Sequence, residues 1–414
     1  MDGGVAERLD SRVMTSTALF PGRLKDLPQG SFAKLAGLLD PLAPGADPIS
    51  LAVGDPKGAV PDFVREALAC HAARFGEYPP INATPQWRQA AAGWLHRRFG
   101  ADLDPEVQVL PLNGTREGLF LAPFLVTPEE KRGARPAILL PNPFYQCYAA
   151  AIYAAGAEPI YVPALAANGF LPDFAGLPQT VLARTVAAYI CSPSNPEGAV
   201  AGEAYWRTLF SLADEYDFTV FADECYADIY REKAPLGAFD VRPPPYDRLL
   251  SFHSLSKRSG LPGLRSGIVA GGIELMTRFR ALRNYAGPQV PAPIIAASIA
   301  AWNDEAHVTA NRALYRERFT LAEQRLGHLS GFHLPDGGFF LWLKAGNGEA
   351  AARRLWQKAG VKVLPGAYMG RETVPGAAET NPGFAYIRIA LVNDLSTIND
   401  ALVRIAQVLS EEAA

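Results

Sequence analysis

A lysine lies at the end of a predicted buried strand, in the segment SFHSLSKRSGLPGLRSG at residues 251–267. Because a desolvated ammonium group is costly unless it is paired or takes part in a covalent bond, Lys257 is unusual for such a position. A Schiff base with an aldehyde cofactor would remove that cost and leave a nitrogen of low pKa for proton transfer. Arg265, eight residues further on, and the hydroxyl of Ser254 could bind a phosphate. Taken alone, a segment of this kind is more often a solvated loop.

An acidic residue ends a second apolar strand, in FADECYADIY at residues 221–230. Asp223 could pair with a protonated pyridine nitrogen and keep an aromatic cofactor ring electron-withdrawing. Tyr226 follows three residues later, close enough in a turn to hydrogen-bond a phenolic oxygen on that ring. The alternative for Asp223 is an ordinary helix N-cap.

Two turns could supply further polar contacts. In CSPSNPEG, residues 191–198, Asn195 precedes Pro196, and the restricted backbone before proline would fix the direction of its amide. NGTREGLF, residues 113–120, is a turn that opens a predicted helix, where backbone N–H groups can bind an anion. The N–H groups of this anion site would belong to Gly114, Thr115 and Arg116. Each turn, taken singly, is also common without a ligand.

Two residues could contact a cofactor and a substrate. Tyr145, in PNPFYQCY, offers a ring that could stack on an aromatic cofactor or belong to the core. Arg388 lies inside the apolar strand FAYIRIALV, residues 384–392. A buried unpaired guanidinium is costly, so Arg388 must meet either an internal carboxylate or the carboxylate of a ligand.

The elements that must position these residues alternate between short apolar runs and helical segments from about 107 to 287. The predicted strands are AILLPNPF, TVAAYICSP, FTVFADECY, RLLSFHSL and RSGIVAGG, and the predicted helices are REGLFLAPFLV, YAAAIYAAGA and EAYWRTLFSLADEYD. This alternation predicts a mostly parallel α/β sheet with helices on both faces. The polar residues follow the carboxyl ends of the strands, where ligands bind in such sheets.

The chain is predicted to divide into three parts. Residues 1–50, with many Pro and Gly, form an arm that joins part of a small domain, and 51–293 form the large cofactor-binding domain. Residues 294–414 contain a long helix from 294 to about 329, then the strands GGFFLWL, VKVLPG and FAYIRIALV, then an amphipathic helix. A chain of 414 residues is long enough for more than one core.

Composition excludes several function classes. The net charge of −3 gives no reason to bind nucleic acid or an anionic membrane, and the most apolar stretch is too short to cross a bilayer. Four scattered cysteines without C-x-x-C spacing favour a reducing cytoplasm, and the acidic N-terminus does not resemble a signal peptide. Six histidines without H-x-x-x-H spacing predict no metal site.

Taken together, these segments resemble the class I and II aminotransferases of fold type I, the group that includes aspartate aminotransferase. The resemblance covers about residue 51 to the end, and the motifs occur in the family's order. They are Asn-Pro-x-Gly at 195–198, Asp-x-x-Tyr at 223–226, Ser-x-x-Lys at 254–257 with an arginine eight residues later, and a late arginine in an apolar strand. The resemblance implies the fold of pyridoxal-phosphate-dependent transferases of fold type I, with pyridoxal 5'-phosphate as cofactor.

The resemblance also implies a role for each residue. Lys257 carries the cofactor as a Schiff base and shuttles the proton, Asp223 pairs with the pyridinium nitrogen, and Tyr226 contacts the ring oxygen. The other cofactor ligands are Asn195 at the ring oxygen, Tyr145 stacked on the ring, and Gly114, Thr115, Arg116, Ser254 and Arg265 at the phosphate. The substrate α-carboxylate is bound by Arg388, with Gly54 and Asn195 beside it.

In the family, a tyrosine corresponding to Tyr78 reaches the phosphate of the neighbouring subunit, which implies a homodimer. This chain departs from the family after that tyrosine: Ala83 replaces the usual glycine, and Trp87-Arg88 replaces Leu-Arg. This departure puts the role of Tyr78 in doubt.

At finer grain, HSLSKRS, PGLRSGIVAG, VLPG and NPGFAYIRIALV resemble the succinyldiaminopimelate aminotransferases of bacterial lysine synthesis. Those enzymes move an amino group between glutamate and N-succinyl-2-amino-6-oxopimelate, and loop 371–383 is expected to contribute to substrate choice. The alternatives are an aspartate- or alanine-type aminotransferase, or a C–S lyase, decarboxylase or synthase on the same fold. A cofactor-binding regulator would need an N-terminal DNA-reading module, which residues 1–50 do not resemble.

Overall fold

A computed structural model describes residues 22–25 and 27–410. Residues 1–21 lie outside the described ranges. They include the first part of the predicted arm and the acidic N-terminus that does not resemble a signal peptide. Short elements connect the main ones and comprise η1 (Gly22–Leu24), α3 (Asp62–His71), η2 (Ala72–Gly76), η3 (Ala166–Asn168), α7 (Gln179–Leu182), α9 (Ala238–Val241), α10 (Leu255–Arg258), η4 (Pro262–Leu264), η5 (Gly366–Met369) and η6 (Ala378–Thr380).

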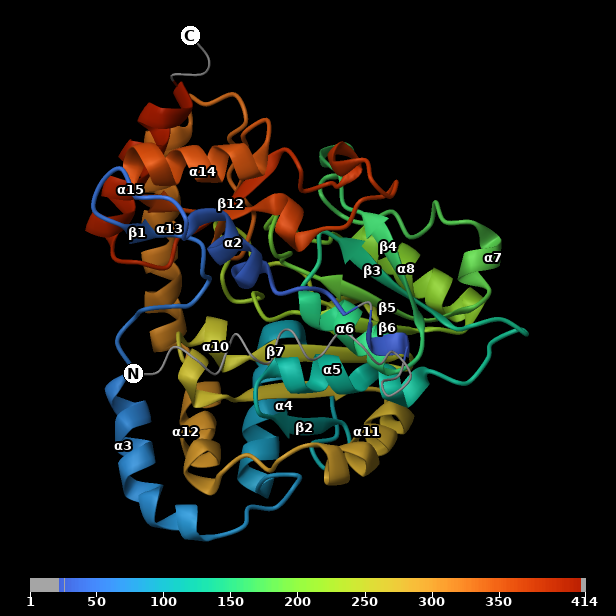
Figure 1. The fold of residues 1–414 in the computed structure, drawn as a ribbon. Coiled ribbons are helices and arrows are strands. Elements are labelled where there is room, and N and C mark those ends of the chain that lie inside the picture. Colours follow the sequence, from blue (N-terminus) through green and yellow to red (C-terminus); the bar gives the residue numbers. More distant parts are fainter. Residues whose placement is uncertain (1–21, 26, 411–414) are drawn as a thin grey trace, which may run out of the picture.

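Within the described ranges, seven strands form the central sheet, and its labelled strands lie one above another in Figure 1. Their spatial order is β2 (Val109–Leu112), β8 (Gly267–Gly271), β7 (Leu249–Ser254), β6 (Thr219–Asp223), β5 (Thr185–Cys191), β3 (Ala137–Asn142) and β4 (Glu158–Pro163). Strands β3 to β7 run parallel, whereas β8 is antiparallel to both neighbours. The predicted mostly parallel sheet is confirmed.

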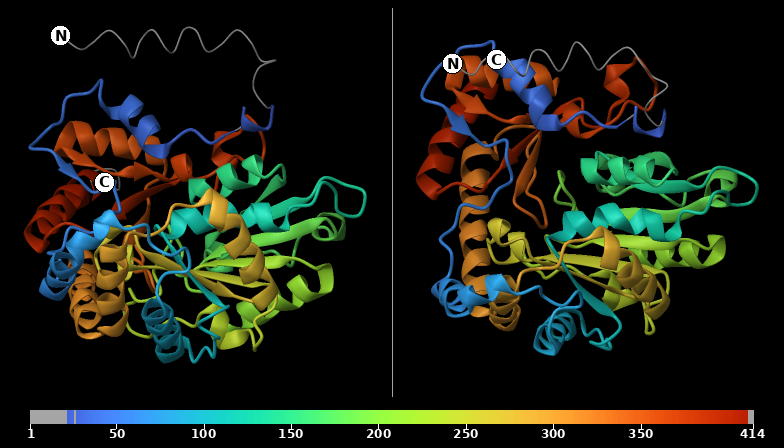
Figure 2. Two further views of the ribbon diagram at one scale, coloured as in Figure 1. Left: turned by 90° about the horizontal axis from the view of Figure 1, so that it is seen from below. Right: turned by 60° about the horizontal axis from the view of Figure 1, so that its bottom comes forward.

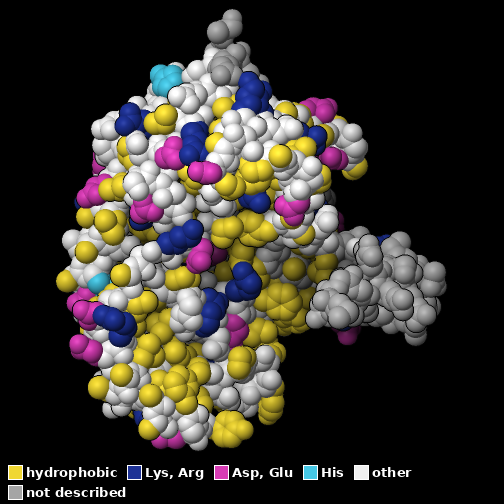
Figure 3. Space-filling model, turned by 60° about the vertical axis from the view of Figure 1, so that its left-hand side comes forward, with side chains coloured by type: hydrophobic (Ala, Val, Ile, Leu, Met, Phe, Trp, Pro, Cys, Tyr) yellow, Lys and Arg dark blue, Asp and Glu magenta, His cyan; other side chains and the backbone are white. Residues whose placement is uncertain are grey.

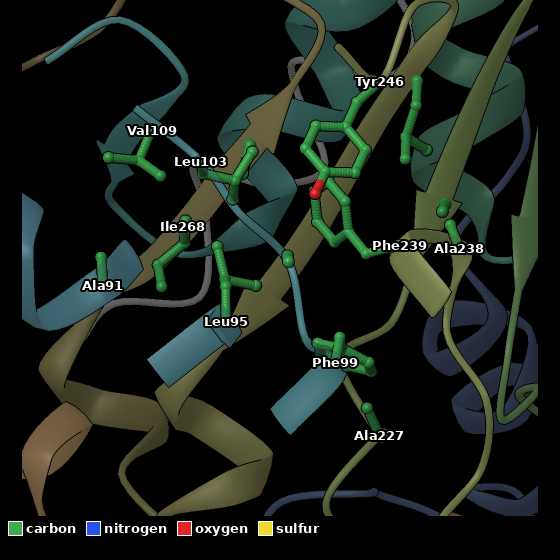
Figure 4. Packing of buried hydrophobic residues seen from close by; sticks show 14 of the residues in the cluster. Ala91, Leu95, Phe99, Leu103, Val109, Ala227, Ala238, Phe239, Tyr246 and Ile268 are labelled. Atoms are coloured by element: carbon green, nitrogen blue, oxygen red, sulfur yellow. The ribbon is translucent and has the colours of Figure 1, made fainter. Parts of the chain in front are cut away.

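Helices cover both faces of this sheet, as predicted (Figures 1 and 2). On one face, α5 (Thr115–Val126), α6 (Gln146–Ala154) and α11 (Ile273–Ala286) pack on alternate strand residues such as Phe221 and Phe252. On the other face, α4 (Pro85–Phe99), α8 (Glu203–Tyr216) and α12 (Ala292–Asn303) pack on Val220 and Leu249. Figure 4 shows part of this second layer, with Leu95 of α4 beside Ile268 and with Phe99 and Tyr246 in the same cluster. Burial on both faces explains why the strands are uniformly apolar.

The C-terminal part builds a second, smaller sheet. Strands β9 (Phe340–Lys344), β11 (Leu364–Pro365) and β12 (Tyr386–Ala390) form an antiparallel sheet in the order β11-β12-β9. It packs with α13 (Ala306–Leu326), α14 (Gly348–Ala359) and α15 (Leu395–Ser410), and α13 runs from the large sheet to this part in Figure 1. The strands and the closing helix predicted for this part are present.

The N-terminal segment packs on this C-terminal part (Figure 2). Strand β1 (Ile49–Ser50) pairs in parallel with β10 (Val361–Lys362). Helix α2 (Ser31–Leu39) buries Leu35 and Leu39 in a cluster with Trp356 and Leu364. The segment therefore contains a helix and a strand as well as extended chain, and the boundaries at 50 and 293 stay a prediction.

The predicted continuous helix from 294 to 329 is wrong, because α12 and α13 are separate helices. The backbone of Asp304 is extended (φ −99°, ψ 125°), and its carboxylate accepts hydrogen bonds from the backbone N–H of His307 at 2.8 Å and from the ring Nδ1 at 2.6 Å. Arg258 also donates to Glu305 at 2.8 Å. These contacts cap a new helix start at a position where the apolar periodicity alone gave no sign of a break.

Candidate active site

A cavity of about 980 Å³ lies at the carboxyl ends of β5, β6 and β7 and is closed on one side by the C-terminal part. The predicted site residues that line it are Gly54, Thr115, Arg116, Tyr145, Asn195, Asp223, Tyr226, Ser254, Lys257, Arg265 and Arg388. Gly114 lies next to it, against Arg265. The structure does not bring Tyr78 into this cavity, and 99% of its surface is exposed. One cavity thus unites segments that are more than 300 residues apart in sequence.

Lys257 projects into the cavity from α10, which begins directly after β7. Its Nζ donates a hydrogen bond of 2.7 Å to the carbonyl of Gly54 and lies 5.1 Å from the centroid of Phe339. Burial lowers the pKa of Lys257 to about 8, while Cys225 and Asp55 act in the opposite direction. A lysine with a lowered pKa is neutral, and so nucleophilic, for a larger fraction of the time near neutral pH.

Asp223 ends β6 and is buried in the wall of the cavity. One carboxylate oxygen accepts a hydrogen bond of 2.5 Å from the hydroxyl of Tyr148, and the other accepts one of 3.3 Å from the backbone N–H of Cys225. Burial raises the pKa of Asp223, whereas these donors lower it. A turn, not a helix, follows the residue, since the next α-helix in the described chain begins at Ala238. The helix-cap alternative is therefore excluded.

Tyr148 was not identified from the sequence, although it orients Asp223. It lies in α6, three residues after Tyr145, and its ring stacks on Tyr189 with a centroid distance of 4.4 Å. The i, i+3 spacing from Tyr145 was the available signal. Whether a buried tyrosine meets a strand-end acid depends on the packing of α6 against the sheet, which a single segment does not reveal.

Arg388 points from β12 into the same cavity. Its Nη1 donates to the amide oxygen of Asn195 at 2.9 Å, its Nη2 donates to the carbonyl of Ala52 at 2.7 Å, and the guanidinium lies 4.1 Å from the ring centroid of Phe340. Burial lowers the pKa of Arg388 to about 10, and none of the described residues forms a hydrogen bond with its Nε. Among the residues described, no carboxylate forms an ion pair with Arg388, so its charge is available to an anionic ligand.

An anion-binding corner forms where α5 begins. Gly114 precedes the helix with φ +79°, and a Cβ there would lie only 2.2 Å from Nη2 of Arg265. That guanidinium donates to the carbonyl of Asn113 at 3.1 Å, which fixes it beside the helix N-terminus. Ser254 also lines the corner. A helix N-terminus combined with a fixed guanidinium is suited to a phosphate group.

The side chain of Arg116 turns away from this corner. Its Nε donates a hydrogen bond of 2.6 Å to the hydroxyl of Tyr145, whose ring borders the cavity. The Tyr145 contact raises the pKa of Arg116, and burial raises the pKa of Tyr145 to about 12. Only the backbone of Arg116 therefore belongs to the helix start. Its side chain belongs to the cavity wall.

The donor set fits pyridoxal phosphate on this geometry. The corner at Gly114 offers an anion site without a Cβ, Asp223 offers a buried carboxylate, and Lys257 offers an amine of lowered pKa in the same cavity. In the described part of the chain, no cluster of three or more His, Cys, Asp or Glu side chains is placed to hold a metal ion. None of the described helices is long and apolar enough to span a membrane.

Comparisons with known proteins agree with this geometry. The family described as aminotransferase class I and II matches residues 46–397. An LL-diaminopimelate aminotransferase of Desulforudis audaxviator is 33% identical over 406 residues, covering 92% of this chain and 96% of that protein. The 4-dedimethylamino-4-oxo-anhydrotetracycline transaminase OxyQ of Streptomyces rimosus is 33% identical, covering 86% and 92%. The crystal structure of an aminotransferase from Neisseria meningitidis is 39% identical, with a TM-score of 0.89 and coverage of 94% and 100%.

The family, the fold type and the cofactor that the sequence motifs implied are thus confirmed. The succinylated substrate is not, because the similar diaminopimelate enzymes are named LL-diaminopimelate aminotransferases. The chain belongs to the class I and II aminotransferases and is a pyridoxal-phosphate-dependent aminotransferase of fold type I.

Proposed function

We propose that this aminotransferase uses glutamate as amino donor and N-succinyl-2-amino-6-oxopimelate as acceptor, as in bacterial lysine synthesis. The similarity of residues 251–267 and 384–392 to the succinyldiaminopimelate aminotransferases supports the succinylated acceptor. The names of several relatives support a diaminopimelate-type substrate more broadly. The main evidence for an amino-acid substrate is Arg388, whose buried guanidinium lies in the same cavity as Lys257. None of the described carboxylates forms an ion pair with it.

The proposed division of labour follows from these contacts. When bound, pyridoxal phosphate supplies an electron-withdrawing ring that stabilises negative charge at the substrate α-carbon. Lys257 would hold the aldehyde group of the cofactor and would move a proton at its Nζ, a task that suits an amine of lowered pKa. Asp223 keeps the pyridine nitrogen protonated, and Tyr148 holds that carboxylate in place.

The remaining residues bind and orient. The phosphate would be held by the N-terminal backbone of α5 at 114–116, by Ser254 and by Arg265. Tyr145 would cover one face of the ring, and the ring oxygen would be bound by Asn195 and Tyr226. Because Asn195 also accepts from Arg388, it would link the ring to the α-carboxylate site, which lies beside Gly54.

The proposed assembly is a homodimer in which Tyr78 reaches the site of the partner. Several large hydrophobic side chains around α3 are exposed, namely Val60, Phe75 and Tyr78. Figure 3 shows hydrophobic side chains gathered on the lower half of one face of the molecule. Apolar side chains gathered in this way are typical of a surface that another subunit covers. A cytoplasmic location remains part of this proposal, supported by four cysteines that are all free.

The proposed reaction can be tested by spectroscopy on the purified enzyme with its cofactor. Glutamate should convert the aldehyde absorption band to that of the amine form. N-succinyl-2-amino-6-oxopimelate should restore the aldehyde band faster than oxaloacetate or pyruvate. Fastest recovery with another acceptor would reject the succinylated substrate. With a sulfur-containing amino acid in place of glutamate, recovery that needs no keto acid and releases a thiol would indicate a C–S lyase.

A further inference from the structure

We infer that Arg283 is a positioning residue for the phosphate of the cofactor, because it neutralises and holds Glu117 at the start of α5. The inference rests on the proposed binding of that phosphate by the corner at Gly114 and Arg265. Arg283 lies in α11 and is not among the described residues that line the cavity. It would act on the phosphate through Glu117 and Asn113, without contact with the cofactor.

A carboxylate lies close to the place where the phosphate is expected to bind. Glu117 is the third residue of α5 and lines the same cavity as Arg265. The N-terminal turn of a helix favours an anion, but a second negative charge that is left unpaired there would repel the first. An unpaired Glu117 would therefore oppose the phosphate site that Gly114 and Arg265 form.

Arg283 pairs with this carboxylate inside the protein. Its Nε lies 2.9 Å from Oε1 of Glu117, and the side chain of Arg283 is fully buried while 12% of that of Glu117 is exposed. Gly287 packs against the pair, since a Cβ there would lie 2.2 Å from Oε1 of Glu117 and 2.9 Å from Cγ of Arg283. Because solvent screens a buried pair only weakly, the guanidinium cancels most of the charge that Glu117 presents to the cavity.

The other carboxylate oxygen of Glu117 fixes the turn before α5. Its Oε2 accepts the backbone N–H of Asn113 at 2.6 Å and the side-chain amide of Asn113 at 3.3 Å. The carbonyl of Asn113 in turn accepts the hydrogen bond of 3.1 Å from Nη2 of Arg265. A continuous series of contacts thus leads from Arg283 to the guanidinium that is proposed to bind the phosphate.

The remaining nitrogens of Arg283 hold two neighbouring loops. Its Nη2 donates at 2.9 Å to the carbonyl of Pro288, which also accepts the side-chain amide of Asn113 at 2.6 Å. Its Nη1 donates to the carbonyl of Ile81 at 3.1 Å. Ile81 lies three residues after Tyr78, so the same buried guanidinium joins the phosphate corner to the loop that would extend to the partner in the proposed dimer.

The test measures how strongly each variant distinguishes pyridoxal phosphate from pyridoxal, which lacks the phosphate. Both compounds are titrated into the full-length apoenzymes, and their dissociation constants are compared. Arg283→Gln leaves the charge of Glu117 unpaired, so it should weaken pyridoxal phosphate about 10-fold or more and pyridoxal less than about 3-fold. Glu117→Gln breaks the same ion pair but removes the negative charge, and its amide oxygen can still accept the N–H of Asn113. It should keep the wild-type affinity for pyridoxal phosphate to within about 3-fold.

Two further variants separate the effect of charge from other effects of the substitution. The double variant Arg283→Gln/Glu117→Gln should regain the wild-type preference for pyridoxal phosphate to within about 3-fold, because neither charge remains. Arg280→Gln is the matched control, since Arg280 lies one turn earlier in the same helix and donates at 3.0 Å to Asn82, in the loop after Tyr78. It should leave both dissociation constants unchanged.

Equal loss of affinity for pyridoxal phosphate in Arg283→Gln and Glu117→Gln would overturn the inference, because the pair would then be structural only. The inference also fails if Arg283→Gln weakens both compounds equally or leaves both unchanged. If Arg283→Gln does not fold, Glu117→Gln and the double variant decide: a retained preference supports the inference, and a lost preference overturns it. An Arg265→Gln variant with an undiminished preference would instead reject the proposed phosphate site itself.

Discussion

At the scale of single residues, the site depends on buried charges whose partners are missing or weak within the protein. Among the described residues, Lys257 donates a hydrogen bond to a backbone carbonyl, and Arg388 donates to an amide oxygen and a carbonyl. Because burial without a counter-charge lowers the pKa of both groups, each gains from a ligand that supplies the missing partner. The two predictions at this scale remove one such group each.

Replacing Lys257 with Ala should abolish turnover while leaving phosphate-dependent cofactor binding. Loss of a general base alone costs about 10²–10⁴-fold, and the covalent attachment is lost too. Borohydride reduction of the wild type, followed by peptide mass mapping, should place the cofactor on Lys257 and leave no label on the variant. Labelling of a different lysine in the wild type would contradict the assignment.

Replacing Arg388 with Ala should preserve the cofactor and its colour but weaken all amino-acid substrates. Truncating one member of a buried charged pair costs roughly 2–5 kcal/mol, on the order of 30- to 5,000-fold in kcat/KM. Amines without a carboxylate should be affected much less, so kcat/KM for glutamate and for a simple amine should be compared. Equal losses for both classes, or loss of the cofactor, would make Arg388 a structural residue.

At the scale of elements, local backbone conformation decides what the site can bind. The start of α5 needs Gly114 at φ +79°, because a side chain there would meet Arg265. The family glycine after Tyr78 is replaced by Ala83, which also adopts a left-handed conformation with φ +57°. The substitution therefore keeps the conformation that glycine normally provides, at some cost in backbone strain.

Gly114→Ala should weaken binding of pyridoxal phosphate about 10-fold or more. The new Cβ would lie 2.2 Å from Nη2 of Arg265 and would push that guanidinium away. Gly133→Ala is the matched control, since that glycine also has a positive φ (+72°) but has no neighbouring atom within 4 Å. The control should share the backbone strain of about 1 kcal/mol without the loss of cofactor. Cofactor affinity can be measured by titrating the apoenzymes. Equal affinities in the two variants would show that the corner at Gly114 does not bind the phosphate.

At the scale of the whole molecule, the site combines the central sheet with the C-terminal part and, in the proposed dimer, with the partner. Arg388 comes from the small antiparallel sheet, and Lys257 comes from the large one. Tyr78 is the predicted site residue that lies wholly on the outer surface, with 99% exposure. Its role can be tested only in an assembly.

Mixing Tyr78→Phe and Lys257→Ala subunits should give a higher activity than the average of the two variants measured separately. In a hybrid dimer, one site would carry both substitutions, and the other would combine an intact Lys257 with an intact Tyr78 from the partner. Random exchange should recover roughly a quarter of wild-type activity, because half of the dimers would hold one good site of two. Activity no higher than the average of the separate variants would argue that Tyr78 does not act across the interface.

The sequence by itself determined the mostly parallel sheet, the family, the cofactor and the residues that could do its chemistry. It could do so because strands buried on both faces are uniformly apolar, so a polar residue at a strand end, such as Lys257 or Asp223, stands out. The tertiary structure decided what no single segment encodes. Tyr148 meets Asp223, Asp304 interrupts a long helix, and Arg116 turns from the phosphate corner to Tyr145. Each of these depends on contacts between segments distant in the chain or on capping hydrogen bonds, and hydrophobic periodicity carries no record of either.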